Sequence, residues 1–200
     1  MNMRTLGIFL YRYRLLQLAM LFFAGVPHVF AADQEAIWKS LQSGGHVVLI
    51  RHAITESGVG DPPGFRLEDC STQRNLSAQG RADAKRIGDA FSKRGIPIAA
   101  VLSSRWCRCL DTAKIAFGRA TPSPMLNSIF NDREKPKEEK IREFREAVAT
   151  MPADGNVIMV THQYNIQAFA DVSPTSGEMV VLKPESGKLR LVGRLTVPDL

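Results

Sequence analysis

Arg51 and His52 are the residues of this sequence best suited to chemistry, because they directly follow an apolar run, Val47–Ile50. A short β-branched run preceded by Gly44-Gly45 predicts a buried strand. An arginine and a histidine are costly to bury unpaired, so at the end of such a strand we expect them to face a cleft. A guanidinium binds phosphate through a fixed fork of donors, and an imidazole acts as a nucleophile or proton carrier near neutral pH. The pair therefore indicates work on an anion.

Two further apolar runs also end in polar residues. Ser103-Ser104 follows the run 98–102, and Thr161-His162 follows the run 157–160. Arg108 lies one turn into the helix expected after Ser104. In sheets of parallel strands, ligands bind at the carboxyl ends of the strands. These side chains are therefore expected to meet Arg51 and His52 at one edge.

The set is suited to phosphoryl transfer, which needs a nucleophile, positive charge and hydrogen-bond donors. We predict His52 as the nucleophile, with its reactive nitrogen unprotonated because a carbonyl binds the other ring nitrogen. Arg51, Arg108 and His162 are expected to hold the phosphoryl group, His162 through a ring N–H. Two arginines and two histidines balance a phosphate dianion, so no cofactor is expected. Scattered Cys and His residues do not predict a metal site.

Strand and helix patterns alternate along the chain, which predicts an α/β fold: a three-layer sandwich with a largely parallel central sheet flanked by helices. Irregular loops are expected at 53–74 and 119–136, and Asn75 or Ser77 is expected to cap the helix after the first loop. The predicted strands are 46–50, 98–102 and 157–160, with a hairpin of 179–182 and 189–195. The predicted helices are 33–41, one carrying residues 82–91, 105–117, 137–150 and 165–170.

The first 31 residues are predicted to be a signal peptide. Three arginines precede an apolar stretch from Leu15 to Val26, and small residues precede a cleavage point after Ala31. The alternative is an uncleaved anchor helix, but the apolar stretch is shorter than the roughly 20 residues that a helix needs to cross a bilayer. Cleavage would leave one domain, 32–200, in the periplasm or outside the cell and without a stable membrane anchor. It would remove three of 26 basic residues and no acidic one, leaving 23 against 20 and a net charge of +3 instead of +6. Such a mild charge does not indicate nucleic-acid binding.

Three cysteines, Cys70, Cys107 and Cys109, remain in the mature chain. Cys107 and Cys109 point apart on a helix, so a disulfide would join Cys70 to one of them. An oxidising compartment favours that bond. Three reduced, buried thiols are an equally acceptable alternative.

Four sequence blocks together resemble the histidine phosphatase superfamily. The resemblance implies a phosphoglycerate mutase-like fold, a covalent phosphohistidine on His52, and phosphoryl binding by Arg51, Arg108 and His162. Ala53 stands where the family more often has glycine. The blocks, in order, are Leu49–Ala53 followed by Thr55, Leu76–Ala84, Ser103–Ala113 and Val160–His162.

The proton donor of the family is not recognisable in this sequence. Ser128 lies near the place where the mutase-like branch has glutamate, and Gln163 stands where the phytase-like branch has aspartate after the second histidine. The candidates are Glu178, Asp132 and Glu134, each of which is otherwise an ordinary surface charge. Glu178, at the start of a strand, is preferred.

Several other residues have competing interpretations. Thr55 and Arg74 are candidates for substrate contact, with ordinary solvated side chains as the alternative. Asp61–Phe65 is interpreted as a rigid turn and Trp106 as packing beneath the cleft. His46 is expected to cap a strand or face solvent, and Lys137–Lys140 to form a solvated helix face.

The predicted function is an exported phosphomonoesterase for a small phosphorylated substrate. In size and leader the chain resembles exported members of the family that are proposed to act on lipopolysaccharide core heptose phosphate. This general resemblance, which no substrate-contacting residue carries, implies a sugar phosphate or lipopolysaccharide core as one candidate substrate class. A phosphoglycerate mutase and a phosphohistidine protein phosphatase fit the family but not the expected location. A catalytically idle protein that binds phosphate or anionic glycan is the alternative from another class.

Overall fold

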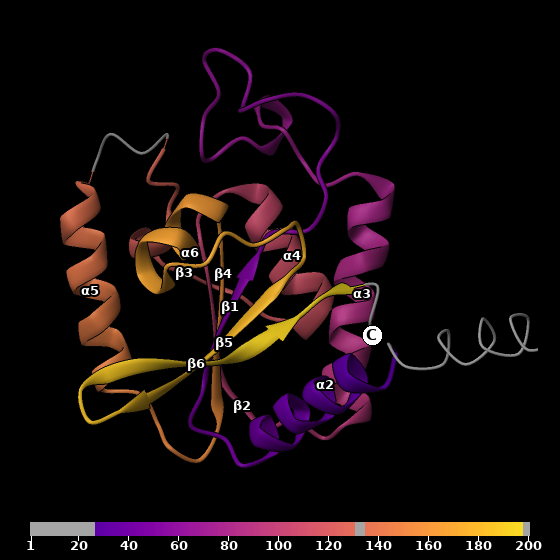
Figure 1. Ribbon diagram of the computed structural model, residues 1–200. Helices are drawn as coiled ribbons and strands as arrows, with labels where there is room; N and C mark the ends of the chain where they lie inside the picture. Colours follow the sequence, from indigo (N-terminus) through magenta and orange to yellow (C-terminus); the bar gives the residue numbers. More distant parts are fainter. Residues whose placement is uncertain (1–26, 131–134, 198–200) are drawn as a thin grey trace, which may run out of the picture. The chain divides into compact units, whose positions relative to one another are not determined.

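A six-stranded sheet forms the centre of the computed structural model, which describes residues 27–130 and 135–197 (Figure 1). The chain divides into units 1–35 and 36–200, and the whole sheet lies in the second unit. The strand order is β3-β2-β4-β1-β5-β6, with β3, β2, β4 and β1 mutually parallel and β5 and β6 antiparallel to their neighbours. The strands are β1 Val47–Arg51, β2 Ile98–Ser103, β3 Thr121–Pro122, β4 Asn156–Thr161, β5 Met179–Glu185 and β6 Lys188–Leu195.

Helices cover both faces of this sheet. Alternate residues of β1 enter opposite cores: Val48 and Ile50 pack with α2, α3 and α4, whereas Val47 and Leu49 pack with α5 and α6. The predicted three-layer α/β sandwich is therefore confirmed, with a mixed sheet. The helices are α2 Pro27–Gln42, α3 Ala78–Lys93, α4 Cys107–Phe117, α5 Lys137–Ala149 and α6 Gln163–Ala170, with short 3-10 turns η1 Cys70–Thr72 and η2 Pro124–Leu126.

Local sequence sets the ends of the helices near the predicted cleft. Ser77 caps α3 by accepting a hydrogen bond from the Gly80 N–H, which confirms one of the two predicted caps. Gly118 ends α4 in the left-handed conformation. Gly80 also lets α3 lie against the segment after β1, since a Cβ there would stand 1.9 Å from the Ile54 carbonyl oxygen.

Four expectations about the fold need comment. Strand β3 lies within 119–136, where irregular chain was expected, because its two residues pair only with the end of β2. His46 is fully buried between Ser40 and Asn156 and does not face solvent. Lys140 is fully buried on α5, where a solvated face was predicted, and donates to the Asn127 carbonyl at 2.8 Å.

The fourth expectation concerns the N-terminus. Helix α2 starts at Pro27, earlier than the predicted start at Asp33, so the proposed cleavage point after Ala31 falls inside this helix of the full-length chain. Residues 1–26 of the predicted signal peptide lie outside the described residues. In the part of the chain that is described, no helix is long and apolar enough to cross a bilayer.

Candidate active site

The carboxyl ends of β1, β2 and β4 lie side by side at one edge of the sheet. Arg51 pairs in register with Thr161, and Ser103 pairs with Val160. The His52 N–H continues the ladder by donating to the Thr161 carbonyl at 2.9 Å. The three strand ends that carry polar residues in the sequence are therefore brought together, as predicted.

His52 is held as a neutral imidazole with one free nitrogen. Its Nδ1 lies 2.9 Å from the Ala53 carbonyl oxygen, which accepts only an N–H and so fixes the hydrogen on Nδ1. Thr112 on α4 also binds Ala53, since its Oγ1 accepts from the Ala53 N–H at 3.1 Å. Burial, with the nearby charge of Arg108, lowers the pKa of His52 to about 3 despite the Ala53 bond. Nε2 therefore carries a lone pair over the whole physiological range.

His162 lies beside this nucleophile with its ring centroid 5.5 Å from that of His52. Its Nε2 is 2.9 Å from Ser104 Oγ, which itself accepts from the Trp106 N–H at 3.3 Å. When the Ser104 hydroxyl donates to Nε2, the ring hydrogen of His162 resides on Nδ1. Burial and the charge of Arg108 lower the pKa of His162 well below its usual value. His162 is thus a neutral hydrogen-bond donor.

Three arginines supply the positive charge of the site. Arg51 donates from Nη1 to the Pro174 carbonyl at 2.9 Å, and Arg74 donates from Nη1 to the Gly58 carbonyl at 2.6 Å. Burial, together with repulsion from a second arginine, lowers the pKa of Arg51 and of Arg74. Among the described residues, five buried side-chain atoms lack a hydrogen-bond partner, and three of them are the Nε atoms of Arg51, Arg74 and Arg108. Buried donors of this kind require an acceptor, and an oxyanion supplies several.

Asp61 also belongs to the site, although the sequence indicated only a turn there. Its Oδ1 accepts from Arg108 Nη1 at 2.7 Å and from the Arg74 backbone N–H at 3.1 Å. Its Oδ2 accepts from Trp106 Nε1 at 3.0 Å. The side chains of Asp61 and Arg108 are 0% and 4% exposed, so this ion pair is fully enclosed. Burial raises the pKa of Asp61, but the hydrogen bond and charge of Arg108 outweigh it and keep the pKa below its ordinary value.

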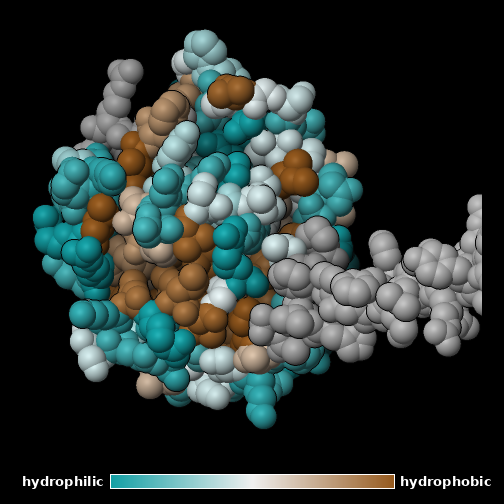
Figure 2. Space-filling model, viewed as in Figure 1, coloured by the Kyte–Doolittle hydropathy of each residue, from teal (hydrophilic) through white to brown (hydrophobic). Residues whose placement is uncertain are grey.

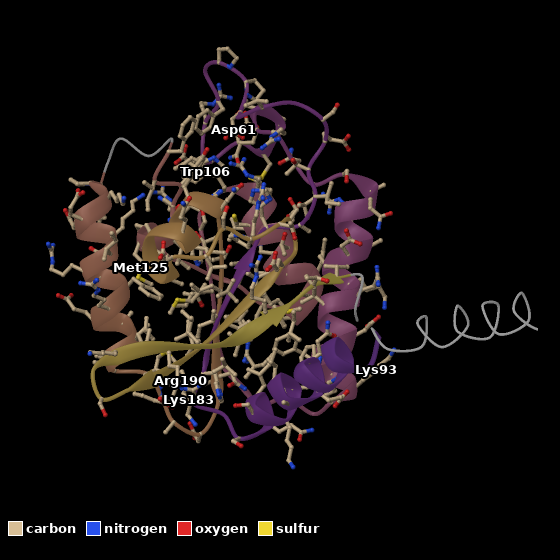
Figure 3. All side chains as sticks on the ribbon, in the orientation of Figure 1. Asp61, Lys93, Trp106, Met125, Lys183 and Arg190 are labelled. Atoms are coloured by element: carbon tan, nitrogen blue, oxygen red, sulfur yellow. A yellow bond between two sulfur atoms is a disulfide. The ribbon has the colours of Figure 1, made fainter. Side chains whose placement is uncertain are left out.

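The loop 53–74 that carries Asp61 lies over the carboxyl edge of the sheet and is attached to the start of α4. Figure 3 shows Asp61 on this overhanging loop with Trp106 beneath it. A disulfide joins Cys70 to Cys107, the residue before Arg108. Gln73 adds a second attachment, since its Oε1 accepts from the Cys107 N–H at 3.0 Å. The predicted disulfide is therefore confirmed with Cys107 as the partner, and Cys109 is a buried free thiol whose pKa burial raises to about 12.

Of the three proton donors predicted from the sequence, the structure describes only Glu178. Glu178 accepts from the Thr175 N–H at 2.7 Å and forms an ion pair with Arg194. Burial raises the pKa of Glu178, but the bonds from Arg194 and Thr175 outweigh it and lower the pKa. Asp132 and Glu134 lie outside the described residues.

The two candidates for substrate contact both lie on the loop 53–74 or next to it. Arg74 is half-buried beside Asp61 and Arg108, as its shared contacts show. Thr55 is half-buried and pairs with Leu76 in an isolated bridge, which places it at the base of the loop.

A separate cavity lies at the opposite end of the sheet. It has a volume of about 680 Å³ and is lined by residues before β1 and β4, by the end of α5 and by the β5–β6 turn. Figure 2 shows apolar residues gathered between α5 and β6 on this side. It contains none of the polar groups described above, so we place the chemistry at the carboxyl edge. In the described ranges, no three His, Cys, Asp or Glu side chains are grouped so as to hold a metal ion.

Comparison with known proteins found one family model that matches part of the chain. Residues 47–134 match the model of the histidine phosphatase superfamily (branch 1), a stretch that includes His52, Asp61 and Arg108. The match supports membership of the histidine phosphatase superfamily. It also supports activity as a phosphoric monoester hydrolase. No curated protein is significantly similar in sequence to the chain.

Solved structures share the fold at low sequence identity. The protein histidine phosphatase SixA, complexed with tungstate, is 15% identical with a TM-score of 0.57 over 77% of this chain and 98% of its own. A mycobacterial glucosyl-3-phosphoglycerate phosphatase, complexed with VO3, is 18% identical with a TM-score of 0.56 over 74% and 97%. YhfR from Bacillus stearothermophilus is 17% identical with a TM-score of 0.54 over 73% and 94%.

Proposed function

We propose that the protein is an exported phosphomonoesterase that transfers the phosphoryl group of a small ester to His52 and then to water, without a metal ion. The observation that carries this proposal is a neutral imidazole, with Nε2 free, beside three arginines whose buried Nε donors have no partner. Such a site offers a nucleophile and a fixed set of donors for one oxyanion.

The charges of the site suit a phosphate ester. The three guanidinium groups of Arg51, Arg74 and Arg108, less the carboxylate of Asp61, leave a net charge of +2, and both histidines are neutral. A phosphate dianion balances that charge. Two proteins with the same fold bind tungstate and VO3, which are oxyanions like phosphate.

The reaction has two steps. In the first, the lone pair of His52 Nε2 forms a bond to phosphorus, the bond from phosphorus to the ester oxygen breaks, and the leaving oxygen gains a proton. In the second, water attacks phosphorus, the phosphorus–nitrogen bond breaks, and inorganic phosphate leaves. Guanidinium groups and the Nδ1–H of His162 stabilise the charge on the transferring group in both steps.

Location and substrate class are carried by the sequence. The signal peptide proposed over 1–31 would deliver the enzyme to the periplasm or the medium, and the Cys70–Cys107 disulfide suits such an oxidising compartment. There it would meet sugar phosphates or the phosphorylated core of lipopolysaccharide. The ion pair between Asp61, on the loop 53–74, and Arg108 is enclosed, which favours a small phosphorylated group over a bulky one.

The test is an assay of the mature protein on an aryl phosphate, comparing the wild type with His52→Ala. We expect hydrolysis by the wild type, unchanged by a chelator, and loss of at least a thousandfold in the variant. Retained activity in His52→Ala would reject the nucleophile, and loss of wild-type activity with the chelator would reject the metal-free mechanism.

A phosphohistidine protein phosphatase is the second candidate, favoured by the fold shared with the protein histidine phosphatase SixA. A phosphohistidine-bearing protein offered alongside small sugar phosphates separates the two. Faster turnover of the phosphoprotein would favour the second candidate. Binding of phosphate without turnover of any ester would instead indicate an idle, anion-binding protein.

A further inference from the structure

We infer that Asp61 is the proton donor to the leaving oxygen, carried into the site by the loop 53–74. The inference rests on the proposed function and supplies the acid that the family pattern leaves unassigned in this chain. It assigns a catalytic role to a residue that the sequence indicated only as part of a turn.

The contacts of Asp61 place its carboxyl group where the phosphoryl group must bind. Its Oδ1 is bound by Arg108 Nη1 at 2.7 Å, and Arg108 also has a buried Nε without a partner. The carboxylate therefore occupies one of the donors that the incoming oxyanion needs. The charges that face Asp61 are those of Arg108 and Arg74, and the buried thiol of Cys109 lies near enough to respond to it.

Substrate binding draws one proton from solvent onto this carboxyl group, so the site, which holds a net +2 when empty, holds +3 against the bound dianion. A phosphoryl dianion takes over donors of Arg108 and adds negative charge beside Asp61. A like charge a few ångström away and the loss of an arginine contact both favour the protonated carboxyl. Trp106 Nε1 keeps Oδ2 in place, so the proton resides on Oδ1, the oxygen that Arg108 releases.

The proton then follows the phosphoryl group through both steps. As the bond from phosphorus to the ester oxygen breaks, the Asp61 carboxyl gives its proton to that oxygen, and the product leaves as an alcohol. The carboxylate formed then takes a proton from the attacking water as the new oxygen–phosphorus bond forms and the bond to His52 breaks. Asp61 ends the cycle protonated, so each turnover consumes one water and no net proton at this group.

The surroundings of Asp61 hold it firmly enough for this role. The Cys70–Cys107 disulfide and the hydrogen bond from the Cys107 N–H to Gln73 both attach the loop to the first residue of α4, directly before Arg108. Glu178, the preferred donor from the sequence, forms its ion pair with Arg194 and not with Arg108. Of the two carboxyl groups, Asp61 and Glu178, it is Asp61 that pairs with a phosphoryl-binding arginine, Arg108.

The test uses esters whose leaving groups differ in their need for a proton. Asp61→Asn is compared with Glu68→Gln, a matched control that removes an exposed carboxylate from the same loop. With phenyl phosphate, whose leaving group is basic, we expect Asp61→Asn to lose 10²–10⁴-fold in kcat/KM, which reports the first step alone. With 2,4-dinitrophenyl phosphate, which leaves without a proton, we expect a loss below tenfold in kcat/KM. Glu68→Gln is expected to match the wild type on both esters.

Binding of inorganic phosphate separates a catalytic from a structural role. Asp61→Asn removes the carboxylate that competes for Arg108, so its affinity for phosphate should equal or exceed that of the wild type. Equal losses on both esters, or weaker phosphate binding, would show that Asp61 only positions Arg108 and would overturn the inference. The proposed function is tested separately by His52→Ala. An inactive His52→Ala variant supports the proposed function even if Asp61 proves not to be the acid, whereas an active His52→Ala variant rejects the proposed function.

The wild type provides an independent measurement that needs no variant to fold. With an acid in place, kcat/KM across a series of aryl phosphates should depend weakly on the pKa of the leaving phenol. A steep dependence would mean that the leaving oxygen departs unprotonated, and it would overturn the role of Asp61.

Discussion

The disulfide between Cys70 and Cys107 is expected to account for a large part of the stability of the domain 32–200. It joins residues 37 positions apart in the sequence and closes the loop that covers the site. Chain-entropy arguments give about 4 kcal/mol of stabilisation for a loop of this length, mainly by restricting the unfolded chain. Total stabilities of domains this size are about 5–15 kcal/mol, so the loss would be readily measured.

The assay is urea unfolding of the mature wild type and of the Cys70→Ser/Cys107→Ser variant, with and without reductant. The variant should lose about 2–4 kcal/mol, the usual range for removing such a bond. Reductant should lower the midpoint of the wild type toward that of the variant and leave the variant unchanged. Cys109→Ser serves as the control, because Cys109 is a free thiol and its variant should remain sensitive to reductant.

The same variant tests whether the loop attachment matters for the site. Releasing Cys107 loosens the loop that presents Asp61 to Arg108, so activity on phenyl phosphate should fall more than activity on dinitrophenyl phosphate. A variant as stable as the wild type, in oxidising buffer, would refute the expected contribution of the disulfide. Equal losses on both esters would refute the link between the disulfide and Asp61.

Three other predictions follow from buried groups. Arg108→Ala strands the carboxylate of Asp61 and should cost about 3–5 kcal/mol in urea unfolding, whereas Arg108→Ala/Asp61→Asn should recover part of that loss; an additive double variant would contradict the pairing. The lowered pKa of His52, about 3 against 6.5, means that the unfolded chain binds more protons between these pH values, so stability falls as pH drops below 6.5. From pH 6.5 to 5 this group contributes up to about 2 kcal/mol, and His52→Asn should show a correspondingly shallower decline; equal slopes would contradict a neutral, buried imidazole. Gly80→Ala should destabilise the protein by about 1–3 kcal/mol, because the added methyl meets the Ile54 carbonyl, whereas Ala82→Gly on the exposed side of α3 should cost at most about 1 kcal/mol.

Much of the fold was predictable because each buried strand is apolar on both faces and ends in polar residues. The apolar run before Arg51 predicted strand β1, the burial of that strand, and the position of Arg51 at its carboxyl end. Ser77 and Gly118 marked helix ends through backbone chemistry that is local in sequence. By contrast, β3 depends only on its neighbour β2, and a two-residue strand containing Pro122 has no pattern of its own.

The site was predictable where its residues stand at strand ends and not where a loop folds back. Asp61 and Arg108 are 47 residues apart, and their contact depends on the path of the loop 53–74. No spacing in that loop distinguishes Asp61 from a turn residue. Similarly, Lys140 lies on a charged helix, and its burial depends on a carbonyl of Asn127 reached only in the folded chain.

Which of the two cysteines pairs with Cys70 depends on how helix α4 is rotated about its axis. Cys107 stands at its first turn facing the loop, whereas Cys109 turns inward, with its Sγ 3.7 Å from the Thr161 carbonyl. Neither the start of this helix nor its rotation could be predicted from sequence closely enough to separate these two positions. It correctly excluded a bond between them.

The central claim is that His52 forms a bond to phosphorus, and turnover mixtures stopped by rapid denaturation at alkaline pH test it directly. The mature enzyme, mixed with a ³²P-labelled ester and stopped within a turnover, should hold phosphate that is acid-labile and alkali-stable and maps by mass spectrometry to His52. The Asp61→Asn variant with the dinitrophenyl ester should accumulate more of it, because removal of the phosphoryl group by water is then slow. Full hydrolysis with no labelled protein, or label on a residue other than His52, would contradict the account.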